Sequence, residues 1–489
     1  MVDIENISYF ALRKLLISKK LLVKELVEYS LLLAEKEAFN AFREITADYA
    51  LKQAKISQSK IDAGKAGLLE GLTVAVKDNF CSKGITTTAC SRMLKNFVPD
   101  YESTVTGKIF SAGAIMIGKT NMDEFAMGSS NTNSYFGNVI NPWKQKNNDI
   151  NLIPGGSSGG SAVAVATRIC AAALGTDTGG SVRLPASFTG TIGVKPTYGR
   201  CSRYGMISFA SSFDQAGVFT NNIQDSAMVL QSMCGFDIKD GTTKNIAPPN
   251  LLGVLGKSIK GVKIGIPREY LSISIHAEIK EHIEEVCKAL RSSGAEIITI
   301  SLPSIQYSLA AYYIISSAEM SSNLARYDGV RYGTRIEYKD MNYIQMVKKT
   351  RSECFGKEVK KRIMMGTYVL SSNHFCDYFQ HAKKIRRIIY NEFADIFNNV
   401  NIIITPTSKS TAFPISAVND SIQLYNNDIF TIPSSLTGLP SLSMPIGLDK
   451  KGLPIGMQLI SSHFAEEDLY RIAYVIERNM CFQHKISLY

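Results

Sequence analysis

The first 60 residues place their apolar side chains at the spacing of helices. Apolar residues recur every three or four positions in FALRKLL, in VKELVEYSLLLAEKE and in ADYALKQAK. This period puts them on one face of each helix, where they can pack against a larger body. We therefore expect residues 1–60 to form an N-terminal helical segment that packs on the rest of the chain.

From Leu72 onward the pattern changes to short apolar runs, several of them closed by Gly, Asp or Thr. Six of these runs are LTVAVK, AIMIGKT, AAALGTD, VKIGIP, EIITISLP and NIIITPT. Runs of this length predict buried strands, and the helical segments between several of them indicate an α/β layered fold. VKIGIP, a helix over about 276–293, and EIITISL predict a strand, helix and strand joined by a right-handed crossover.

The same pattern suggests how the chain is divided. We expect one large α/β domain over residues 61–489, on which the N-terminal segment packs. The region of about 240–400 is the candidate for an insertion within that domain, because possible linkers lie near both of its ends. No internal repeat is visible.

Composition narrows the class of protein. With 45% hydrophobic and 20% charged residues, the chain can bury a large core. The uncharged stretches 297–318 and 429–448 contain prolines, so we interpret them as buried segments and expect no contact with a membrane. Nine cysteines without a C-x-x-C pair argue against a zinc site or a disulfide framework, so we expect no metal site and a cytoplasmic protein.

The net charge of +11 permits contact with nucleic acid. The sequence has no dense basic tract interleaved with aromatic residues. KKIRRIIY, residues 383–390, comes nearest, and such a run is typical of the solvated face of a helix.

GAIMIGKT, residues 113–120, matches the P-loop pattern for binding nucleotide phosphates. A P-loop needs a strand, a glycine-rich loop and then a helix. Here Gly113 closes a helix-like segment, the apolar residues AIMI favour a strand, and Asp123 and Glu124 follow closely. We therefore expect a buried strand here and no phosphate ligand at Lys119.

The strongest chemical signal is a pair of loops rich in glycine and serine. PGGSSGGSA begins at Pro154, and GTDTGGSVRLPAS begins at Gly175, with a helix of about 161–169 and the strand AAALGT between them. A single loop of this kind is usually only a turn. Two at the ends of α/β elements suit an anion cradle, and the absence of lysine from the second loop favours acyl chemistry over phosphate binding.

Acyl chemistry needs a base, and the residues leave two alternatives. The first loop also fits the G-x-S-x-G nucleophile elbow, with Ser157 as nucleophile and His374 or His463 as base. The other candidate base is Lys77, which ends an apolar strand. Burial there would lower its pKa and make it a neutral proton acceptor.

Together, LTVAVKDNF, PGGSSGGSA and GTDTGGSVRLPAS resemble the amidase signature family. The resemblance implies one large domain with a central mixed β-sheet covered by helices on both faces. It also implies a Ser-Ser-Lys triad in which Lys77 is the base, Ser157 relays a proton and follows a cis peptide bond, and Ser181 is the nucleophile. The implied oxyanion hole consists of the backbone N–H groups of Thr178, Gly179, Gly180 and Ser181.

Further segments, including ARYDGVRYG and EVKKRIMMGTY, resemble one branch of that family, the glutaminase subunits of tRNA-dependent amidotransferases. The resemblance implies that glutamine is hydrolysed and its ammonia passed to a B subunit in a heterotrimer with B and C subunits. The complex amidates Glu-tRNA(Gln), and in some systems Asp-tRNA(Asn). ATP and Mg²⁺ act in the partner subunit, and no cofactor binds this chain.

Glutamine is a zwitterion, so its site needs a cation and an anion. The resemblance implies that these are Arg362 and Asp428, with Tyr312 beside them.

A stand-alone amidase and a non-catalytic subunit that binds tRNA or a partner protein remain the alternatives. For the triad itself, we expect hydrogen bonds of about 2.6–3.2 Å to join Lys77 Nζ to Ser157 Oγ and Ser157 Oγ to Ser181 Oγ.

Overall fold

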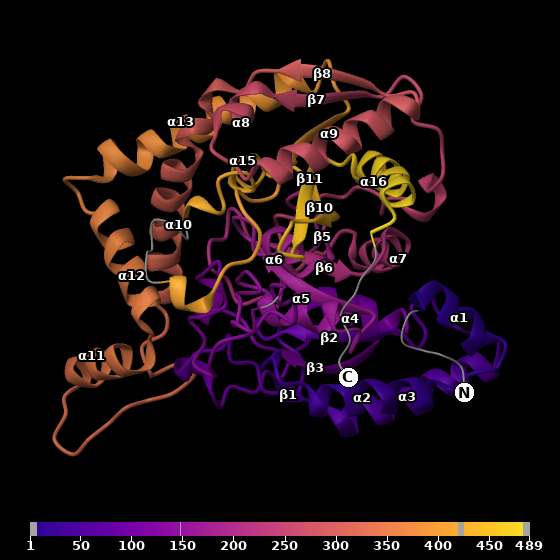
Figure 1. The fold of residues 1–489 in the computed structure, drawn as a ribbon. Helices are drawn as coiled ribbons and strands as arrows, with labels where there is room; N and C mark the ends of the chain where they lie inside the picture. Colours follow the sequence, from indigo (N-terminus) through magenta and orange to yellow (C-terminus); the bar gives the residue numbers. More distant parts are fainter. Residues whose placement is uncertain (1–6, 147, 419–424, 483–489) are drawn as a thin grey trace.

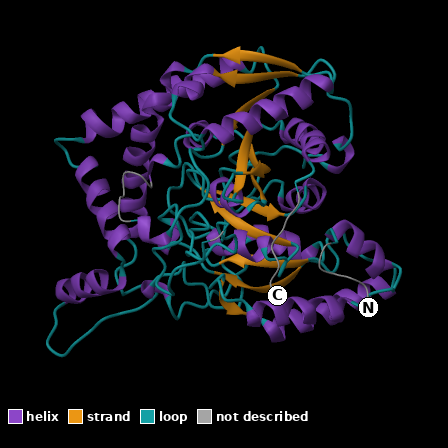
Figure 2. Ribbon diagram, in the orientation of Figure 1, coloured by secondary structure: helices purple, strands orange, loops and turns teal. Residues whose placement is uncertain are grey.

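A β-sheet of eleven strands runs through the molecule (Figures 1 and 2). The computed structural model describes residues 7–146, 148–418 and 425–482, and the strand count refers to these ranges. The strands follow the order β1-β3-β2-β4-β6-β5-β10-β11-β9-β7-β8 across the sheet. Their bounds are β1 Phe42–Ile45, β2 Thr73–Lys77, β3 Ile115–Thr120, β4 Ala172–Asp177, β5 Ile192–Lys195, β6 Gln215–Thr220, β7 Lys263–Pro267, β8 Glu296–Ile300, β9 Ile402–Pro406, β10 Ser441–Leu448 and β11 Pro454–Ser461.

The sheet is mixed. β2 runs parallel to β3 and to β4, and β7 runs parallel to β8 and to β9, whereas the other neighbouring strands are antiparallel. All six strands predicted from the short apolar runs are present. The predicted crossover is also confirmed, because α9 (Ala277–Ser292) connects the parallel strands β7 and β8. β1, β5, β6, β10 and β11 were not predicted.

Helices cover both faces of the sheet, which confirms the predicted α/β class. In β2, Val74 and Val76 face one apolar core while Ala75 faces another, since alternate residues of a strand point to opposite faces. The first core includes side chains of α4 (Thr104–Ser111), α7 (Ile223–Met233), α9 and α16 (Glu466–Met480). The second includes side chains of α2 (Val23–Lys36), α3 (Ala47–Asp62) and α5 (Gly159–Ala166).

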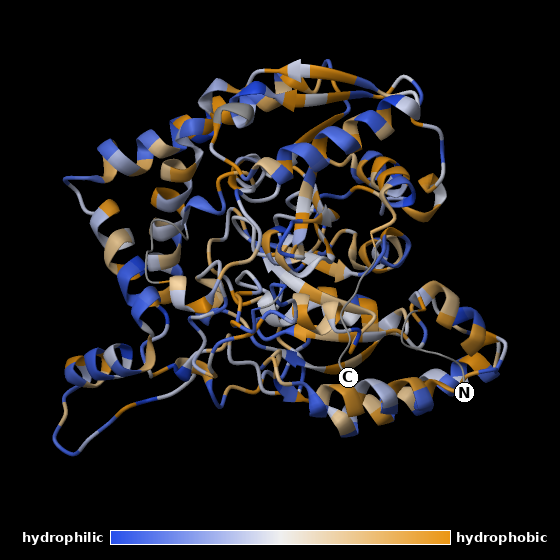
Figure 3. Cartoon of the chain, in the orientation of Figure 1, coloured by the Kyte–Doolittle hydropathy of each residue, from blue (hydrophilic) through white to orange (hydrophobic). Residues whose placement is uncertain are grey.

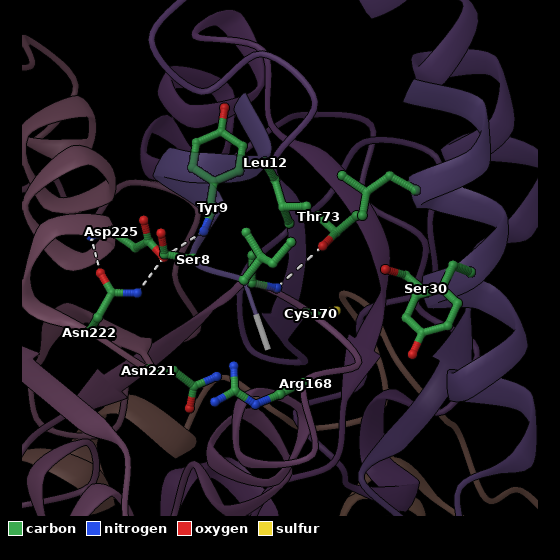
Figure 4. Close-up of a pocket in the computed structure, with 14 residues that line it drawn as sticks. Ser8, Tyr9, Leu12, Ser30, Thr73, Arg168, Cys170, Asn221, Asn222 and Asp225 are labelled. Atoms are coloured by element: carbon green, nitrogen blue, oxygen red, sulfur yellow. Dashed lines mark hydrogen bonds between the residues drawn. The ribbon is translucent and has the colours of Figure 1, made fainter. Parts of the chain in front are cut away.

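The N-terminal segment contains a strand as well as the expected helices. β1 pairs antiparallel with β3 at the edge of the sheet, between α2 and α3. The helix α1 (Tyr9–Ile17) is attached to the main body through Asp225, whose carboxylate accepts from the backbone N–H groups of Tyr9 and Phe10, each at 2.9 Å. Figure 4 shows Asp225 and Tyr9 at the side of a pocket of about 50 Å³.

A group of helices stands beside the sheet (Figure 1). In the sequence, these helices follow β8 and precede β9. It consists of α10 (Ser308–Leu324), α11 (Tyr343–Cys354), α12 (Lys357–Val369) and α13 (His381–Ile396). A third apolar core includes side chains of α10, α12 and α13. The short helices α8 (Arg268–Ser272) and α15 (Ile432–Thr437) contribute to it as well. In the candidate insertion, β7 and β8 thus extend the main sheet, and the part that follows β8 is helical. The division into domains stays a prediction, and residues 1–6 and 483–489 lie outside the described residues.

The P-loop-like segment forms β3, as predicted. Lys119 is fully buried, and its ammonium donates to the carbonyl of Phe80, with Asp78 Oδ1 at 3.8 Å. α4 precedes the strand and a loop follows it, so the order is helix, strand and loop. Lys119 holds the chain around residues 78–82 and is not available to a phosphate.

The two long uncharged stretches lie inside the fold. Residues 297–318 span β8 and much of α10, and residues 429–448 span α15 and β10. Figure 3 shows hydrophobic residues gathered along the strands, with hydrophilic residues prominent on outer helices such as α11. Across the described ranges, no helix has both the length and the apolar character needed to span a membrane.

Candidate active site

Lys77 lies at the carboxyl end of β2, in the interior of the sheet. Because β2 pairs parallel with β4, with Val76 opposite Leu174, Lys77 comes beside Thr176 at the end of β4. Its side chain is fully buried. Lys77 Nζ donates to three hydroxyls, those of Ser157 at 2.8 Å, Ser158 at 2.7 Å and Thr176 at 2.9 Å. The carboxyl ends of parallel strands are where open α/β sheets place their ligands.

The surroundings of Lys77 favour its neutral form. Burial lowers its pKa from the ordinary 10.5 to about 7, because the ammonium loses its hydration. The negative charges of Asp123 and Asp177 act in the opposite direction and limit the fall. At neutral pH, a substantial fraction of Lys77 therefore carries a lone pair that can take a proton.

The first serine loop brings Ser157 against Lys77. Ser157 is buried and follows a cis peptide bond from Gly156, as the family resemblance implied. The hydroxyls of Ser157 and Ser181 are not hydrogen-bonded to each other within the described residues. Of the two predicted links, the one from Lys77 to Ser157 is confirmed, and the one from Ser157 to Ser181 is not formed in this arrangement.

Ser181 lies in the second serine loop, between β4 and α6 (Arg183–Thr189). It is 8% exposed, whereas Ser157 is completely buried, so it is the serine of the pair that reaches the surface of the site. Its hydroxyl makes no hydrogen bond with any residue in the described part of the chain. Such a hydroxyl is available to a substrate.

The backbone around Ser181 supplies the donors expected of an oxyanion hole. None of the N–H groups of Thr178, Gly179, Gly180 and Ser181 donates to another group in the part of the chain that the structure describes. Buried N–H groups are rarely left without an acceptor. Gly180 has φ +153°, and a Cβ there would lie 2.3 Å from Thr431 Oγ1, so a side chain would not fit.

Arg183 holds the second loop, a role that the sequence patterns did not predict. Its fully buried guanidinium makes a bidentate contact with Asp177, with nitrogen–oxygen distances of 2.9 and 2.8 Å. It also donates to the carbonyl of Thr431 and to side chains of α15 and β11. This pairing keeps the pKa of Asp177 below its usual value despite burial. The only sequence signal was an arginine two residues after the candidate nucleophile.

Asp123 holds the first loop, and this role was also not predicted. Its carboxylate accepts from the backbone N–H groups of Asn131 at 2.9 Å and Asn133 at 3.1 Å, and its own N–H donates to the carbonyl of Ser157 at 3.2 Å. A Cβ at Gly156 would lie 2.1 Å from Asp123 Oδ2, so only glycine permits this close approach. Burial raises the pKa of Asp123 to about 6, which leaves it mostly ionised at neutral pH.

Two of the three predicted substrate residues lie against the second loop. A Cβ at Gly179 would come within 2.7 Å of the Tyr312 ring, and one at Gly180 would come within 3.1 Å of Asp428 Oδ1. Burial raises the pKa of Asp428 to about 8, and the charge of Asp177 adds to this effect while Arg362 opposes it. A bound cation would favour the ionised carboxylate.

Arg362 lies on the inner face of α12. Its Nε donates to Glu358 Oε1 at 2.7 Å, and its guanidinium centre lies 5.5–5.6 Å from the ring centroids of Phe209, Tyr313 and Tyr425. It makes no ion pair with Asp428 among the described residues, although the two charges influence each other. A buried cation and a buried anion thus lie apart on different elements, which suits a zwitterionic ligand.

Glu124 connects α12 to the catalytic loops. Its carboxylate accepts from Ser91 Oγ and from the backbone N–H of Gly356 at 2.8 Å, directly before α12 begins. A carboxylate at a helix N-terminus is favoured by the helix dipole. Since Asp123 is the adjacent residue, one short segment contacts both the Ser157 loop and the helix that carries Arg362.

The structure does not support the histidine alternative. His463 makes a ring hydrogen bond with the carbonyl of Thr437 at 2.9 Å, and His374 stacks on Tyr368. Neither is hydrogen-bonded to Ser157 in the described ranges. All nine cysteines are free, and no cluster of three or more metal-binding side chains occurs among the described residues.

Comparison with known proteins identifies the family. The family model named Amidase matches residues 25–470, so the chain belongs to the amidase family. The A subunit of glutamyl-tRNA(Gln) amidotransferase from Orientia tsutsugamushi (strain Ikeda) is 52% identical over 441 residues, 90% of each chain. The protein of the same name from Bartonella tribocorum is 49% identical over 484 residues, 98% of each chain.

A solved structure gives the same result. The crystal structure of the A subunit of glutamyl-tRNA(Gln) amidotransferase from Thermotoga maritima superposes with a TM-score of 0.76 at 36% identity. The match covers 94% of this chain and 95% of that one. The resemblance inferred from the serine loops is thus confirmed over nearly the whole chain.

The lowered pKa of Lys77 predicts how activity depends on pH. A base must be neutral to act, so kcat/KM for glutamine should fall about tenfold per pH unit below pH ~7 and level off above it. Because the charge of Asp123 raises the pKa of Lys77, Asp123→Asn should move the midpoint of this limb to lower pH. Asp225→Asn, which changes a buried carboxylate outside the site, is the control and should leave the midpoint in place. An unchanged midpoint in Asp123→Asn would contradict the coupling.

The contact between Arg183 and Asp177 predicts a coupled loss of stability. Arg183→Met leaves the carboxylate of Asp177 buried and unpaired, which should lower the free energy of unfolding by about 3–5 kcal/mol. The double variant Arg183→Met/Asp177→Asn removes both charges and should lose less than the sum of the two single variants. Denaturant unfolding measures each value, and strict additivity would show that the two side chains are not energetically coupled.

Proposed function

We propose that this chain is the glutaminase of a tRNA-dependent amidotransferase, in which it forms the A subunit. The observation that carries the proposal is a buried lysine with a lowered pKa, 2.8 Å from Ser157 Oγ, beneath a loop that presents the hydroxyl of Ser181. The close similarity to proteins named as the A subunit of glutamyl-tRNA(Gln) amidotransferase supports it.

Proton transfer starts at Lys77. In its neutral form, Lys77 takes the proton of Ser157, and Ser157 takes the proton of Ser181 as Ser181 Oγ attacks the side-chain amide carbon of glutamine. The site must bring the two serine hydroxyls within hydrogen-bonding distance when substrate binds, since catalytic hydrogen bonds often tighten only in the complex. Lys77 then returns the proton through Ser157 to the leaving nitrogen.

The C–N bond breaks as the tetrahedral intermediate collapses, which releases ammonia and leaves a glutamyl ester on Ser181. The N–H groups of residues 178–181 stabilise the negative oxygen of the intermediate, and a single donor of this kind contributes roughly 3 kcal/mol. Water then attacks the ester along the reverse proton path and releases glutamate. Neither half of the reaction needs a metal ligand from this chain.

The substrate is held by its two charged ends. Arg362 binds the α-carboxylate and Asp428 the α-ammonium, with Tyr312 beside the second serine loop. Both charged residues are nearly buried, at 5% and 8% exposed, so their interactions with glutamine are weakly screened. A neutral amide without these charges would lose both contacts.

The ammonia is used in partner subunits. Glu-tRNA(Gln) is activated with ATP and Mg²⁺ in the B subunit and amidated there, and the C subunit completes a cytoplasmic heterotrimer. Some complexes of this type also convert Asp-tRNA(Asn). ATP chemistry thus belongs to the complex, whereas the P-loop-like segment of this chain is a buried structural strand.

The proposal is tested by measuring glutaminase activity with and without partners. The chain purified with its B and C subunits should hydrolyse glutamine faster when ATP and Glu-tRNA(Gln) are added, and the isolated chain should be weakly active. Vigorous turnover of varied amides by the isolated chain would instead identify a stand-alone amidase.

Ser181→Ala should lower glutamine-dependent amidation by at least about 10³-fold, because the nucleophile is lost. Amidation by the same complex with added ammonium chloride should persist, which controls for folding and assembly. Mass spectrometry of an acid-quenched reaction should locate the glutamyl ester on Ser181 in the unmodified complex. An unchanged glutaminase rate in Ser181→Ala, or an ester on Ser157, would refute this mechanism.

A further inference from the structure

The positive charge of the chain is concentrated in one part of the fold. Residues 326–390, here called the basic limb, contain 15 Lys and Arg against 6 Asp and Glu, a net charge of +9 out of +11 for the whole chain. The basic limb comprises a long loop, α11, α12 and part of α13, and it projects to one side of the sheet (Figure 1). The sequence alone did not reveal this concentration, because the cations are spread over four segments.

Many of these cations are exposed and form no ion pair among the described residues. Arg331, Arg335 and Lys349 have acidic partners. Nine further exposed cations of the basic limb form no ion pair with any residue that the structure describes, and these are Arg326, Lys339, Lys348, Lys357, Lys360, Lys361, Lys383, Lys384 and Arg387. Only three of the acids in the basic limb, Glu337, Asp340 and Asp377, are exposed.

Exposed aromatic side chains lie among the cations. On α12, residues 357, 360 and 361 share the outward face with Met364 and Tyr368, because they recur at helical spacing. Tyr338 is 56% exposed on the loop and Tyr343 is 63% exposed at the start of α11. In Figure 3, α11 is largely hydrophilic.

The side chains of this surface favour a nucleic acid over a protein as its partner. Seven of its nine unpaired cations are lysines, and lysine is depleted in protein–protein interfaces. Lysines spread over a surface suit the phosphates of a nucleic acid backbone, and exposed tyrosines can stack on unpaired bases. The buried side of α12 carries Arg362, so the outward face can bind a polyanion without involving the substrate site.

We propose that the basic limb is an RNA-binding surface, which contacts the backbone of the aminoacylated tRNA during amidation. The choice of tRNA rests on the proposed function, whereas the preference for RNA rests on the charge and aromatic pattern of the surface. The basic limb adds electrostatic affinity to whatever the partner subunits contribute.

The test compares two variants of equal charge. The limb variant carries Lys339→Gln, Lys348→Gln, Lys383→Gln and Lys384→Gln, all outside the proposed substrate site. The control variant carries Lys52→Gln, Lys55→Gln, Lys257→Gln and Lys288→Gln, four exposed lysines elsewhere. The probe is a fluorescent tRNA(Gln) transcript, titrated with each full chain at several salt concentrations.

The limb variant should bind about tenfold or more weakly at ~0.15 M salt, and the slope of log K against log salt should be shallower by roughly 0.7–0.9 per lost phosphate contact. The control variant should stay within about twofold of the unmodified chain. Equal weakening of both variants, or no weakening of the limb variant, would overturn the proposal.

Two further measurements distinguish an RNA-binding surface from a protein-binding one. If the limb variant fails to copurify with the B and C subunits but binds RNA normally, the surface serves a protein partner and the proposal is wrong. Glutaminase activity without tRNA should be unchanged in both variants. Absence of glutaminase activity in the unmodified complex even with ATP and Glu-tRNA(Gln) would refute the proposed function while leaving the RNA-binding result to stand on its own.

Discussion

The site depends on a lysine that is buried without a carboxylate in contact. Two lysines are fully buried on the adjacent parallel strands β2 and β3, where Val76 pairs with Lys119 and Lys77 pairs with Thr120. Lys119 has Asp78 at 3.8 Å, and it holds the chain after β2. Lys77 contacts only hydroxyl and carbonyl oxygens in the described ranges, and burial lowers its pKa to about 7 although the charges of Asp123 and Asp177 oppose the fall. The immediate surroundings thus make Lys119 a structural residue and leave Lys77 able to act as a base.

The rest of the site keeps both serine loops fixed around this lysine. The carboxylate of Asp177, at the end of β4, is paired with the guanidinium of Arg183. Its charge is therefore balanced by Arg183 and not by Lys77. Asp123 remains close enough to raise the pKa of Lys77, but its carboxylate oxygens are engaged by backbone N–H groups of residues 131 and 133. Asp123 and Asp177 therefore raise the pKa of Lys77 and also hold the two serine loops in place.

The sequence predicted the parts of the fold that local pattern controls. The six compact apolar runs formed strands, and α9 lies within one residue of its predicted bounds. The missed strands lack such runs. β5 has only four residues, and β10 contains Pro445 next to a register shift, the kind of position where a strand tolerates proline. β1 interrupts a helical segment because it pairs with β3, a partner more than 70 residues away.

For the site, motifs predicted the loops, but contacts between distant segments could not be derived from them. A lysine at the end of a strand usually reaches solvent, and Lys77 is buried because β3 and β4 flank β2 on both sides. The roles of Arg183, Asp123 and Glu124 depend on partners that lie up to about 275 residues away in sequence. Nothing in local periodicity indicates such pairings, and the charge of the basic limb becomes visible only when its four segments are brought together.

The most direct test of this account is the titration of Lys77 itself. Protein containing lysine labelled with ¹³C at Cε can be followed by NMR from pH 5 to 11, with the signal assigned by its loss in Lys77→Met. We expect a midpoint near pH 7, well separated from the solvated lysines. A midpoint near 10.5 would show that Lys77 stays protonated at neutral pH, and it would contradict the claim that this lysine is the base that starts the reaction.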